Sequence, residues 1–315
     1  MQLRVGVAGV RRGWGFASVL AAHPSAELVA IADPDMQRCN DAAAEYDVPV
    51  QCTDYDELLG IDLDAVVIAT PAPLHTAQSI AALSAGRHVL CEVPAVASLD
   101  EAQALVQAVK GSSGSYMLAE NVNYFDRTLA WQRFIDEGQL GTIHYAEAEY
   151  VHDCSSLFTH PDGTPTWRAS LPPIHYCTHS LGPLLAWTGD RCVSVTGMHT
   201  GSHLRPDLGT IDMEVGIFRT AAGGVFKILC GFSVMSEPGR HWYCVYGTRG
   251  MLESGRTADS PDRGFLAAQR EQTAGPAANV VPAAERLVPA AAVQGGHGNS
   301  EWYMVDEWLA AVVDG

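Results

Sequence analysis

The sequence has no run of about 18 consecutive apolar residues, so it offers no candidate for a membrane-spanning helix. Its first apolar segment is short and interrupted by glycines, which argues against a secretory signal peptide. Cationic side chains are scarce as well, since 19 Lys and Arg residues stand against 36 Asp and Glu residues and leave a formal charge of −17. This balance argues against binding along a nucleic-acid backbone and against a basic membrane-surface protein.

The eight cysteines contain no CxxC pair, and their wide spacing is typical of reduced thiols that lie mostly in the core. We therefore expect a cytoplasmic protein. With 315 residues, the chain is long enough for about two domains. Histidine is unevenly distributed, because seven of the 12 histidines lie between residues 144 and 203.

The first 119 residues alternate short apolar runs with stretches of helical period. Strands that are apolar on both faces and alternate with helices predict a doubly wound parallel sheet. The predicted strands are Leu3–Ala8, Leu28–Ala32, Ala65–Ala69 and His88–Cys91, and the predicted helices are Ala17–Ala22, Asp35–Glu45, Leu74–Ala85 and Leu99–Val109. Ser98 and Glu101 form a capping-box pattern at the start of the last helix.

After residue 119 the pattern changes to strand-like segments with fewer helices, which predicts an α+β domain on a largely antiparallel sheet. We therefore place two domains at residues 1–119 and 120–315. Residues 254–299 show no clear periodicity and are expected to form a long surface excursion. The predicted strands are Gly141–His152, Met213–Thr220, Val225–Val234 and Trp242–Tyr246, and the predicted helices are Arg127–Glu137, His179–Trp187 and 301–313.

A glycine-containing turn, Gly9–Gly15, joins the first predicted strand to a helix. Glycines at such a turn let the backbone approach a pyrophosphate, which the amides of the helix N-terminus then bind. The strict G-x-G-x-x-G spacing is not met, because Arg11 and Trp14 stand at the second and third glycine positions. A plain strand-to-helix turn therefore stays an alternative.

Asp33 ends the second predicted strand and is placed to accept hydrogen bonds from an adenine ribose. A carboxylate there repels a 2′-phosphate, so the sequence favours NAD over NADP. The alternative is a turn residue before Pro34. Three cations could soften the preference for NAD: Arg11, Arg12 and Arg38.

Several motifs in this order resemble the Gfo/Idh/MocA family of oxidoreductases. They are Gly-Val-Ala-Gly, Ile-Ala-Asp-Pro-Asp, Val-Ile-Ala-Thr-Pro-x-x-x-His and Gly-Arg-His-Val-Leu-Cys-Glu-x-Pro, followed by Glu137-Gly-Gln-Leu-Gly141, Trp167-Arg168 and Tyr246-Gly-Thr-Arg-Gly250. The resemblance implies an N-terminal Rossmann domain and a C-terminal domain whose open, mostly antiparallel sheet often mediates oligomerisation. It also implies a sugar or cyclitol as substrate. One departure is Val93, where the family carries a lysine beside the nicotinamide; valine cannot move a proton, so another residue must do so.

A narrower set of motifs is similar to a branch that contains NAD-dependent α-N-acetylgalactosaminidases. These enzymes oxidise the sugar transiently, eliminate across the adjacent bond and return the hydride. The motifs are Glu-Val-Pro-Ala, Ala-Glu-Asn-Val-Asn-Tyr, Tyr150-Val-His-Asp153, Tyr176-Cys-Thr-His-Ser-Leu-Gly-Pro183 and Gly296-His-Gly-Asn-Ser-Glu301. By motif position, the active-site residues would be Glu120, Tyr150, Tyr176 and His179.

Among these residues, His179 is the strongest candidate for the base that takes a hydroxyl proton. His175, four residues earlier, could lie on the same helix face and orient it, although packing is an equal alternative. Tyr150 and Tyr176 could donate to a substrate oxygen or deprotonate a carbon beside a carbonyl, with packing as the alternative. Glu120 ends an apolar run, where a carboxylate is costly unless it is paired or meets a ligand.

The residues expected to hold the cofactor gather at the predicted strand ends, because ligands of open parallel sheets bind there. Trp167 and Arg168 could stack on the cofactor and hydrogen-bond to it, with a surface ion pair as the alternative. We expect no metal, since the histidine spacings match no common zinc motif. The predicted cofactor set is Gly9, Arg11, Arg12, Gly13, Trp14, Asp33, Arg38, Thr70, Pro71, His75, Glu92, Pro94, Asn121, Trp167 and Arg168.

Three functional hypotheses follow. The first is an NAD-dependent oxidoreductase acting on a ring hydroxyl of a sugar, cyclitol or glycoside. The second is a redox-neutral NAD-dependent glycosidase, and the third is a non-catalytic NAD-binding or assembly protein. We expect a small carbohydrate-like substrate, homo-oligomerisation through the C-terminal sheet, and no nucleic-acid or membrane partner.

Overall fold

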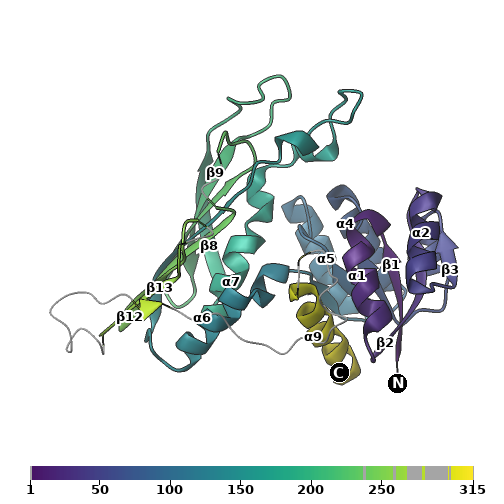
Figure 1. Cartoon of the computed structure of the whole chain (residues 1–315), viewed down its shortest axis with the longest axis horizontal. Helices are drawn as coiled ribbons and strands as arrows, with labels where there is room; N and C mark the ends of the chain where they lie inside the picture. The colour runs from purple at the N-terminus through teal and green to yellow at the C-terminus, as the bar shows by residue number, and fades with distance from the viewer. Residues whose placement is uncertain are drawn as a thin grey trace. The chain divides into compact units, whose positions relative to one another are not determined.

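The computed structural model describes residues 2–236, 239–257, 260–267, 279–280, 297 and 299–314. The chain divides into two compact units (Figure 1). The first unit comprises residues 1–124 and 286–315, and the second comprises residues 125–285. The predicted division after residue 119 differs from this result in two ways: the first unit continues to Tyr124, and the C-terminal helix belongs to it.

The first unit is built on a six-stranded parallel sheet with the order β3-β2-β1-β4-β5-β6. The order reverses between β1 and β4, and this switch point is where open parallel sheets bind their ligands. The predicted doubly wound parallel sheet is confirmed. Its strands are β1 Leu3–Ala8, β2 Ala26–Ala32, β3 Val50–Cys52, β4 Ala65–Ile68, β5 His88–Cys91 and β6 Tyr116–Leu118.

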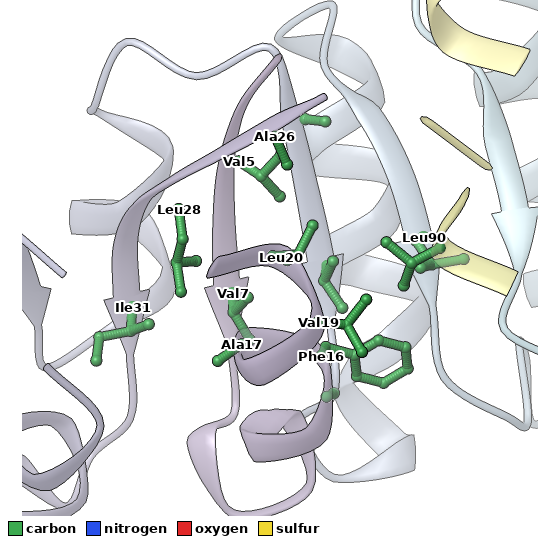
Figure 2. Close-up of a cluster of buried hydrophobic side chains, with 14 of the residues drawn as sticks. Val5, Val7, Phe16, Ala17, Val19, Leu20, Ala26, Leu28, Ile31 and Leu90 are labelled. Carbon is green, nitrogen blue, oxygen red and sulfur yellow. The ribbon is translucent and has the colours of Figure 1, made fainter. Parts of the chain in front are cut away.

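Helices cover both faces of this sheet, because alternate strand residues point to opposite sides. One face packs Val5, Val7 and Ile31 against Phe16 and Leu20 of the first helix (Figure 2). The other face contributes a second buried cluster around Val66 and Ile68, with side chains from α3, α4 and α5. The helices are α1 Val10–Ala22, α2 Met36–Tyr46, α3 Tyr55–Leu59, α4 His75–Ser84, α5 Leu99–Gly111 and α9 Ser300–Asp314, with short 3-10 turns at Ala72–Leu74 and Asn121–Tyr124.

Helix α9 is part of the first core. Val305, Trp308 and Leu309 are almost fully buried in the same cluster as the β1 side chains. Burial of such side chains contributes about 2 kcal/mol each. This apolar stripe explains why the helix joins the first unit, although it is distant in sequence.

The caps of the first unit follow the sequence pattern. The Ser98 hydroxyl accepts a hydrogen bond from the Glu101 amide, as the capping box predicts. The Glu101 carboxylate returns to the Ala97 amide instead of the Ser98 amide. Helix α1 begins at Val10, seven residues earlier than predicted, so most of the expected glycine turn is helical.

The second unit is built on an eight-stranded sheet with the order β14-β13-β12-β11-β7-β10-β9-β8. Only the pair β7 and β10 is parallel among the paired strands, so the predicted mostly antiparallel sheet is confirmed. Its strands are β7 Ile143–Val151, β8 Cys192–His199, β9 Met213–Thr220, β10 Val225–Gly231, β11 His241–Gly247, β12 Gly250–Glu253, β13 Arg263–Leu266 and β14 Asn279–Val280.

Among the described residues, helices pack on one face of this sheet, and the other face is open. Helix α7, Thr178–Thr188, packs against β7, β10 and β11, and α6, Asp126–Asp136, packs against α7 (Figure 1). The covered face buries Ala146, Ala148 and Ile228. The open face carries ion pairs that join Lys227 to Glu147 and Arg256 to Glu149.

The predicted surface excursion at residues 254–299 is described only in part. Its described residues include β13 and the backbone of β14, which extend the sheet beyond β12. Most of residues 268–298 lie outside the described residues.

Candidate functional site

The N-terminus of α1 lies at the carboxyl end of β1, beside the switch point. Gly9 adopts a left-handed conformation with φ of 85° and, as the N-cap residue, has no side chain that could bond to the first-turn amides. A Cβ on Gly9 would lie 2.5 Å from the carbonyl oxygen of Ala69, so only glycine fits. First-turn amides have no acceptor within their own helix and are suited to a pyrophosphate, so the turn fits a dinucleotide.

Gly13 packs the helix against the sheet, since a Cβ there would lie 2.7 Å from the Val7 side chain. Close helix–strand packing is the role of the third glycine in the dinucleotide fingerprint. The fingerprint places this glycine at position 14, where this chain has Trp14. Gly13 makes the close contact one position earlier. Trp14 is 37% exposed and packs edge-on against Tyr46.

Asp33 organises the turn from the end of β2. Its Oδ2 accepts from the Val10 amide at 2.9 Å, and its Oδ1 accepts from the Asp35 amide at 2.9 Å. Arg38 Nη1 lies 3.5 Å from the same Oδ1. These contacts match the turn role weighed from the sequence, and a ribose contact for Asp33 and Arg38 stays a prediction. Arg11 is exposed at the start of α1.

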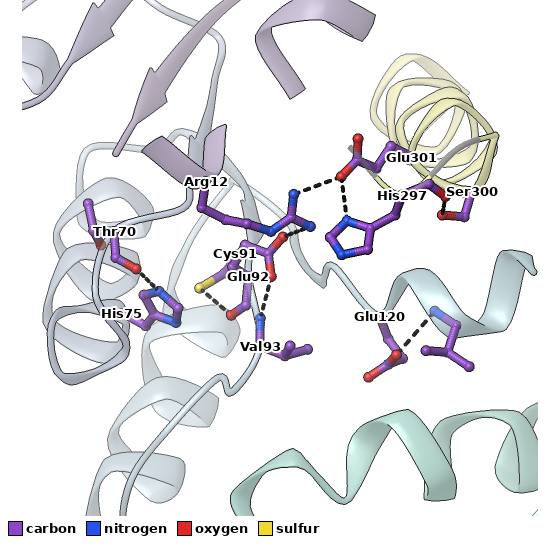
Figure 3. Close-up of polar contacts among 11 residues, drawn as sticks. Arg12, Thr70, His75, Cys91, Glu92, Val93, Glu120, His297, Ser300 and Glu301 are labelled. Atoms are coloured by element: carbon purple, nitrogen blue, oxygen red, sulfur yellow. Dashed lines mark hydrogen bonds and ion pairs between the residues drawn. The ribbon is translucent and has the colours of Figure 1, made fainter. Parts of the chain in front are cut away.

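Arg12 lies between two carboxylates instead of pointing freely to solvent (Figure 3). Its guanidinium is 2.5 Å from Glu92 Oε1 and 2.7 Å from Glu301 Oε1. Glu301 is fully buried and is also 3.1 Å from His297 Nδ1. Burial opposes the charge of Glu301, but the hydrogen bond to His297 and the charge of Arg12 outweigh it and lower its pKa. Gly15 makes this possible, because a Cβ there would overlap Glu301 Oε2.

His75 joins the segments that follow β4 and β5. Its Nδ1 is 2.8 Å from the Pro94 carbonyl oxygen and its Nε2 is 2.7 Å from the Thr70 carbonyl oxygen. Carbonyls only accept, so both ring nitrogens must donate and His75 is an imidazolium. Burial opposes this charge, but contacts with Cys91 and the two carbonyls raise the pKa of His75 to about 9.

The other predicted residues of this unit lie at the same strand ends. Pro71 follows β4 and is exposed. Val93 follows β5 and is buried, and the peptide bond between Val93 and Pro94 is cis. Glu120 and Asn121 follow β6 and are buried, and Glu120 Oε1 accepts from the Val122 amide at 3.2 Å (Figure 3).

In the second unit, three of the predicted catalytic residues, Tyr150, Tyr176 and His179, form one aromatic cluster on the covered face of the sheet. The Tyr150 ring lies 4.8 Å from His179, edge-to-face, and 6.3 Å from Tyr176, stacked. Burial raises the pKa of Tyr150 well above its ordinary value, with smaller effects of Cys154 and Tyr176. Its phenol therefore stays protonated and is suited to donate a hydrogen bond.

His179 is buried in the first turn of α7. Its backbone is fixed from the sheet, because the Tyr243 hydroxyl donates to the His179 carbonyl oxygen at 2.6 Å. His175 lies in a separate 3-10 turn, Pro173–Tyr176, so the expected common helix face with His179 is not formed. Pro172 and Pro173 start that turn, and α7 begins only at Thr178.

Trp167 and Arg168, predicted for the cofactor, belong to the second unit. The Arg168 guanidinium lies 4.3 Å above the Trp167 ring. Arg168 Nη1 donates to the Tyr176 hydroxyl at 3.2 Å, which links this pair to the aromatic cluster. A cofactor contact for the pair stays a prediction.

Two further histidines belong to the cluster and were absent from the predicted set. His152 Nδ1 is 3.3 Å from the Tyr150 hydroxyl, and the His241 ring is stacked 5.0 Å from the Tyr150 ring. The sequence carried a signal for His152, since Tyr150 and His152 are two apart at a strand end and therefore share a face. For His241 the signal lies in strand register, which pairs it directly with Tyr150.

Among the described residues, no group of three or more His, Cys, Asp or Glu side chains is arranged to hold a metal ion. Within the same residues, no helix is both long and apolar enough to cross a membrane.

Comparisons with known proteins support this description of the first unit. Residues 3–120 match a family model described as an oxidoreductase family with an NAD-binding Rossmann fold, named GFO_IDH_MocA. A glycosyl hydrolase family 109 protein of Saccharopolyspora erythraea is 30% identical over 218 residues, covering 63% of this chain and 48% of the relative. A protein of the same name from Shewanella pealeana is 30% identical over 288 residues, covering 79% of this chain and 62% of the relative. The chain thus spans about half to under two thirds of these relatives.

Solved structures with the same fold extend over the whole chain. Levoglucosan dehydrogenase in complex with NADH aligns with a TM-score of 0.81 at 22% identity, covering 100% of this chain and 90% of the other. Myo-inositol 2-dehydrogenase from Lactobacillus plantarum aligns with a TM-score of 0.73 at 18% identity, with the same coverage of both chains. At these identities the likeness establishes the fold.

Proposed function

Residues 3–120 belong to the Gfo/Idh/MocA family of NAD-binding oxidoreductases, and from this premise we propose that the protein is an NAD-dependent oxidoreductase acting on a ring hydroxyl of a sugar, cyclitol or glycoside. The observation that carries the proposal is the N-terminus of α1, which follows the left-handed Gly9 and lies at the switch point of the parallel sheet. The names of the structural neighbours, which include a levoglucosan and a myo-inositol dehydrogenase, support the class of substrate.

The residues of the first unit bind and orient the cofactor in this proposal. NAD, when bound, supplies the acceptor for the hydride of the substrate CH–OH group. The first-turn amides of α1 that follow Val10 would bind its pyrophosphate, while Asp33, which accepts from the Val10 amide, would also accept from the adenine ribose. Arg12 is held by Glu92 and Glu301, so it adds a fixed positive charge near this turn.

The cluster of the second unit takes the hydroxyl proton. His179 is the base, because an imidazole can accept a proton near neutral pH. Tyr150 donates a hydrogen bond to the substrate oxygen, consistent with its protonated phenol. With this assignment, His179 and Tyr150 replace the lysine that the family carries at the position of Val93, since the buried valine side chain can move no proton.

A second candidate function is the redox-neutral glycosidase, favoured by the names of the curated relatives. Oxidation of a ring hydroxyl acidifies the neighbouring C–H, and elimination then breaks the glycosidic bond. Water would then add to the resulting unsaturated ketone, and the returned hydride would reduce the ketone to the alcohol, so no net NADH would accumulate. The Tyr150 hydroxyl lies 3.3 Å from His152 Nδ1, so a neutral His152 with its proton on Nε2 would accept the Tyr150 proton when Tyr150 acts at that carbon.

One set of assays separates these functions. Purified protein is first tested for bound NAD, and then incubated with NAD and levoglucosan, myo-inositol or aryl α-N-acetylgalactosaminides. Net NADH with a polyol supports the oxidoreductase, whereas aryl release with catalytic NAD and no net NADH supports the glycosidase. If His179→Ala and Tyr150→Phe leave every activity at the wild-type level, the non-catalytic alternative is favoured. His144→Ala is the matched control, because His144 is exposed on the same strand as Tyr150.

We further propose that the open face of the second sheet forms a homo-oligomer. Met198 on β8 is 80% exposed, and Ile217 on the neighbouring strand β9 is 46% exposed. Ile217 pairs with Lys227 on β10, which in turn pairs with Glu147 on β7. Exposed apolar side chains with polar and charged residues around them mark protein–protein interaction sites. Met198→Glu with Ile217→Glu is expected to shift the protein to monomers in light scattering.

The eight free cysteines fit a cytoplasmic location, which we also propose.

A further inference from the structure

His241 lies at the start of β11, directly opposite Tyr150 in the antiparallel pair of β7 and β11. Residues that face each other in this way project to the same side of the sheet. The two rings are stacked at 5.0 Å with an interplanar angle of 24°. His241 therefore belongs to the covered face that carries the predicted catalytic side chains.

The His241 ring contacts two other members of its surroundings. It lies 5.9 Å from the His179 ring, edge-to-face, and 5.6 Å from the Phe125 ring, edge-to-face. Stacking on Tyr150 and these edge contacts hold the imidazole in one orientation. Its two nitrogens thus have fixed directions beside Tyr150 and His179.

One of these nitrogens, Nδ1, makes no hydrogen bond within the described residues. His241 Nδ1 is buried and has no hydrogen-bond partner there. A buried polar atom without a partner costs free energy, and such atoms in native proteins call for an explanation such as a ligand. Packing alone would be satisfied by a phenylalanine at this position, so the nitrogen requires another reason.

The charges around the ring keep it neutral. Burial lowers the pKa of His241 to about 3, and the neighbouring His179, Arg127, Arg240 and His152 add to this effect. An imidazole with so low a pKa is too weak a base to take a proton from an alcohol near neutral pH. It still offers one N–H donor and one bare nitrogen acceptor, which together suit a hydroxyl group.

We propose that His241 binds a hydroxyl group of the substrate ring through its neutral imidazole and thereby selects for that hydroxyl. The inference rests on the proposed function, and it divides the work of the two histidines. His179 is the base, whereas His241 is a substrate-binding residue that moves no proton. The ligand class is a polyhydroxylated ring, a sugar or cyclitol, with a hydroxyl next to the reacting one.

The test compares wild type with His241→Phe, which keeps an aromatic ring that can stack on Tyr150 but removes both nitrogens. His144→Phe is the matched control, since His144 is exposed at the other end of β7. We expect kcat/KM for the active polyol to fall by about 10- to 100-fold, mainly through KM. The midpoint of the acid limb of the kcat profile is expected to stay in place, and NAD binding is expected to stay at the wild-type level.

A series of singly deoxygenated substrates identifies the bonded hydroxyl. Wild type is expected to lose activity when that hydroxyl is absent, and His241→Phe is expected to show no further loss for the same analogue. Equal kcat/KM of wild type and His241→Phe on every analogue overturns the inference while the proposed function stands. His241→Gln provides a second variant, because its amide restores a donor and an acceptor and is expected to recover part of the activity.

A binding measurement separates this inference from the proposed function. Wild type loaded with NADH is titrated with levoglucosan or myo-inositol by calorimetry. Binding that is lost in His241→Phe, with no turnover in wild type, supports the inference and contradicts the oxidoreductase. The absence of both binding and turnover, for polyols and aryl glycosides alike, overturns both.

Discussion

Replacing His75 by glutamine is expected to destabilise the folded protein strongly at low pH and much less at high pH. His75 is buried, and both of its ring nitrogens face backbone carbonyls, those of Thr70 and Pro94. Glutamine can donate to one of these carbonyls, but it carries no charge. The variant therefore removes the part of the stability that depends on protonation.

The magnitude follows from the pKa of His75. Contacts with Cys91 and with the two carbonyls overcome the opposing effect of burial and raise this pKa from 6.5 to about 9. Each pKa unit corresponds to about 1.4 kcal/mol, so protonation of His75 stabilises the folded protein by about 3 kcal/mol. Because the folded pKa is the higher one, this stabilisation is fully present below about pH 6.5 and is lost as the pH rises through about 9.

The assay is urea unfolding of wild type and His75→Gln at about pH 6 and about pH 10. The difference in unfolding free energy between the two proteins is expected to be larger at the lower pH by about 3 kcal/mol. His144→Gln is the control, because that exposed histidine has no such partners and its difference is expected to stay within about 0.5 kcal/mol at both pH values. Histidine ring signals in NMR give an independent readout of the protonation of His75.

Two results would refute this reasoning. One is a destabilisation by His75→Gln that has the same size at both pH values. The other is a His75 ring that NMR shows as neutral at about pH 7, because one carbonyl would then face a bare nitrogen and the geometry would need another explanation.

Three further predictions concern the first unit. Gly9→Ala is expected to destabilise by more than about 2 kcal/mol in urea and to abolish NAD binding, whereas Gly138→Ala, with φ of 70° and open space, is expected to cost only about 1–2 kcal/mol. Glu301→Gln is expected to lower the unfolding free energy by about 2–3 kcal/mol at neutral pH. Because the pKa of Glu301 is lowered in the folded protein, this difference from wild type is present above about pH 4.5 and disappears as the pH falls. Urea unfolding of both proteins over an acidic pH series checks this. Ser98→Ala is expected to lower the unfolding free energy by about 1 kcal/mol through loss of the α5 cap, and a change below about 0.3 kcal/mol would contradict this.

The sequence predicted the parallel sheet well because its signals are local. Strands β1, β4 and β5 are mainly apolar, with Arg4 and His88 as the exceptions, and each is followed by a helical pattern. Strand β3 and helix α3 were missed because three and five residues are too few to show a period. The C-terminal helix was predicted but assigned to the second domain. Its apolar stripe indicates that the helix packs on a core, but it does not indicate which of the two cores.

The candidate site was predicted in proportion to how local its geometry is. Asp33, Thr70 and Glu92 follow strands directly, so chain order alone places them at one edge of the sheet. His241 depends on the pairing of β7 with β11, which are neighbours in the sheet although α7, β8, β9 and β10 lie between them along the chain. Register is set by packing and turns together, so no pattern within β11 could mark His241.

The imperfect glycine fingerprint shows the difference between a motif and the geometry it represents. Gly9 keeps the left-handed turn against Ala69, and Gly13 keeps the close packing against Val7. Gly15 has a different reason, since the fully buried Glu301 carboxylate occupies the place of its side chain. Three glycines thus meet three separate contacts of this chain. A dinucleotide turn therefore requires small residues where the backbone of α1 approaches its neighbours, and the spacing of those residues follows the neighbours instead of a fixed pattern.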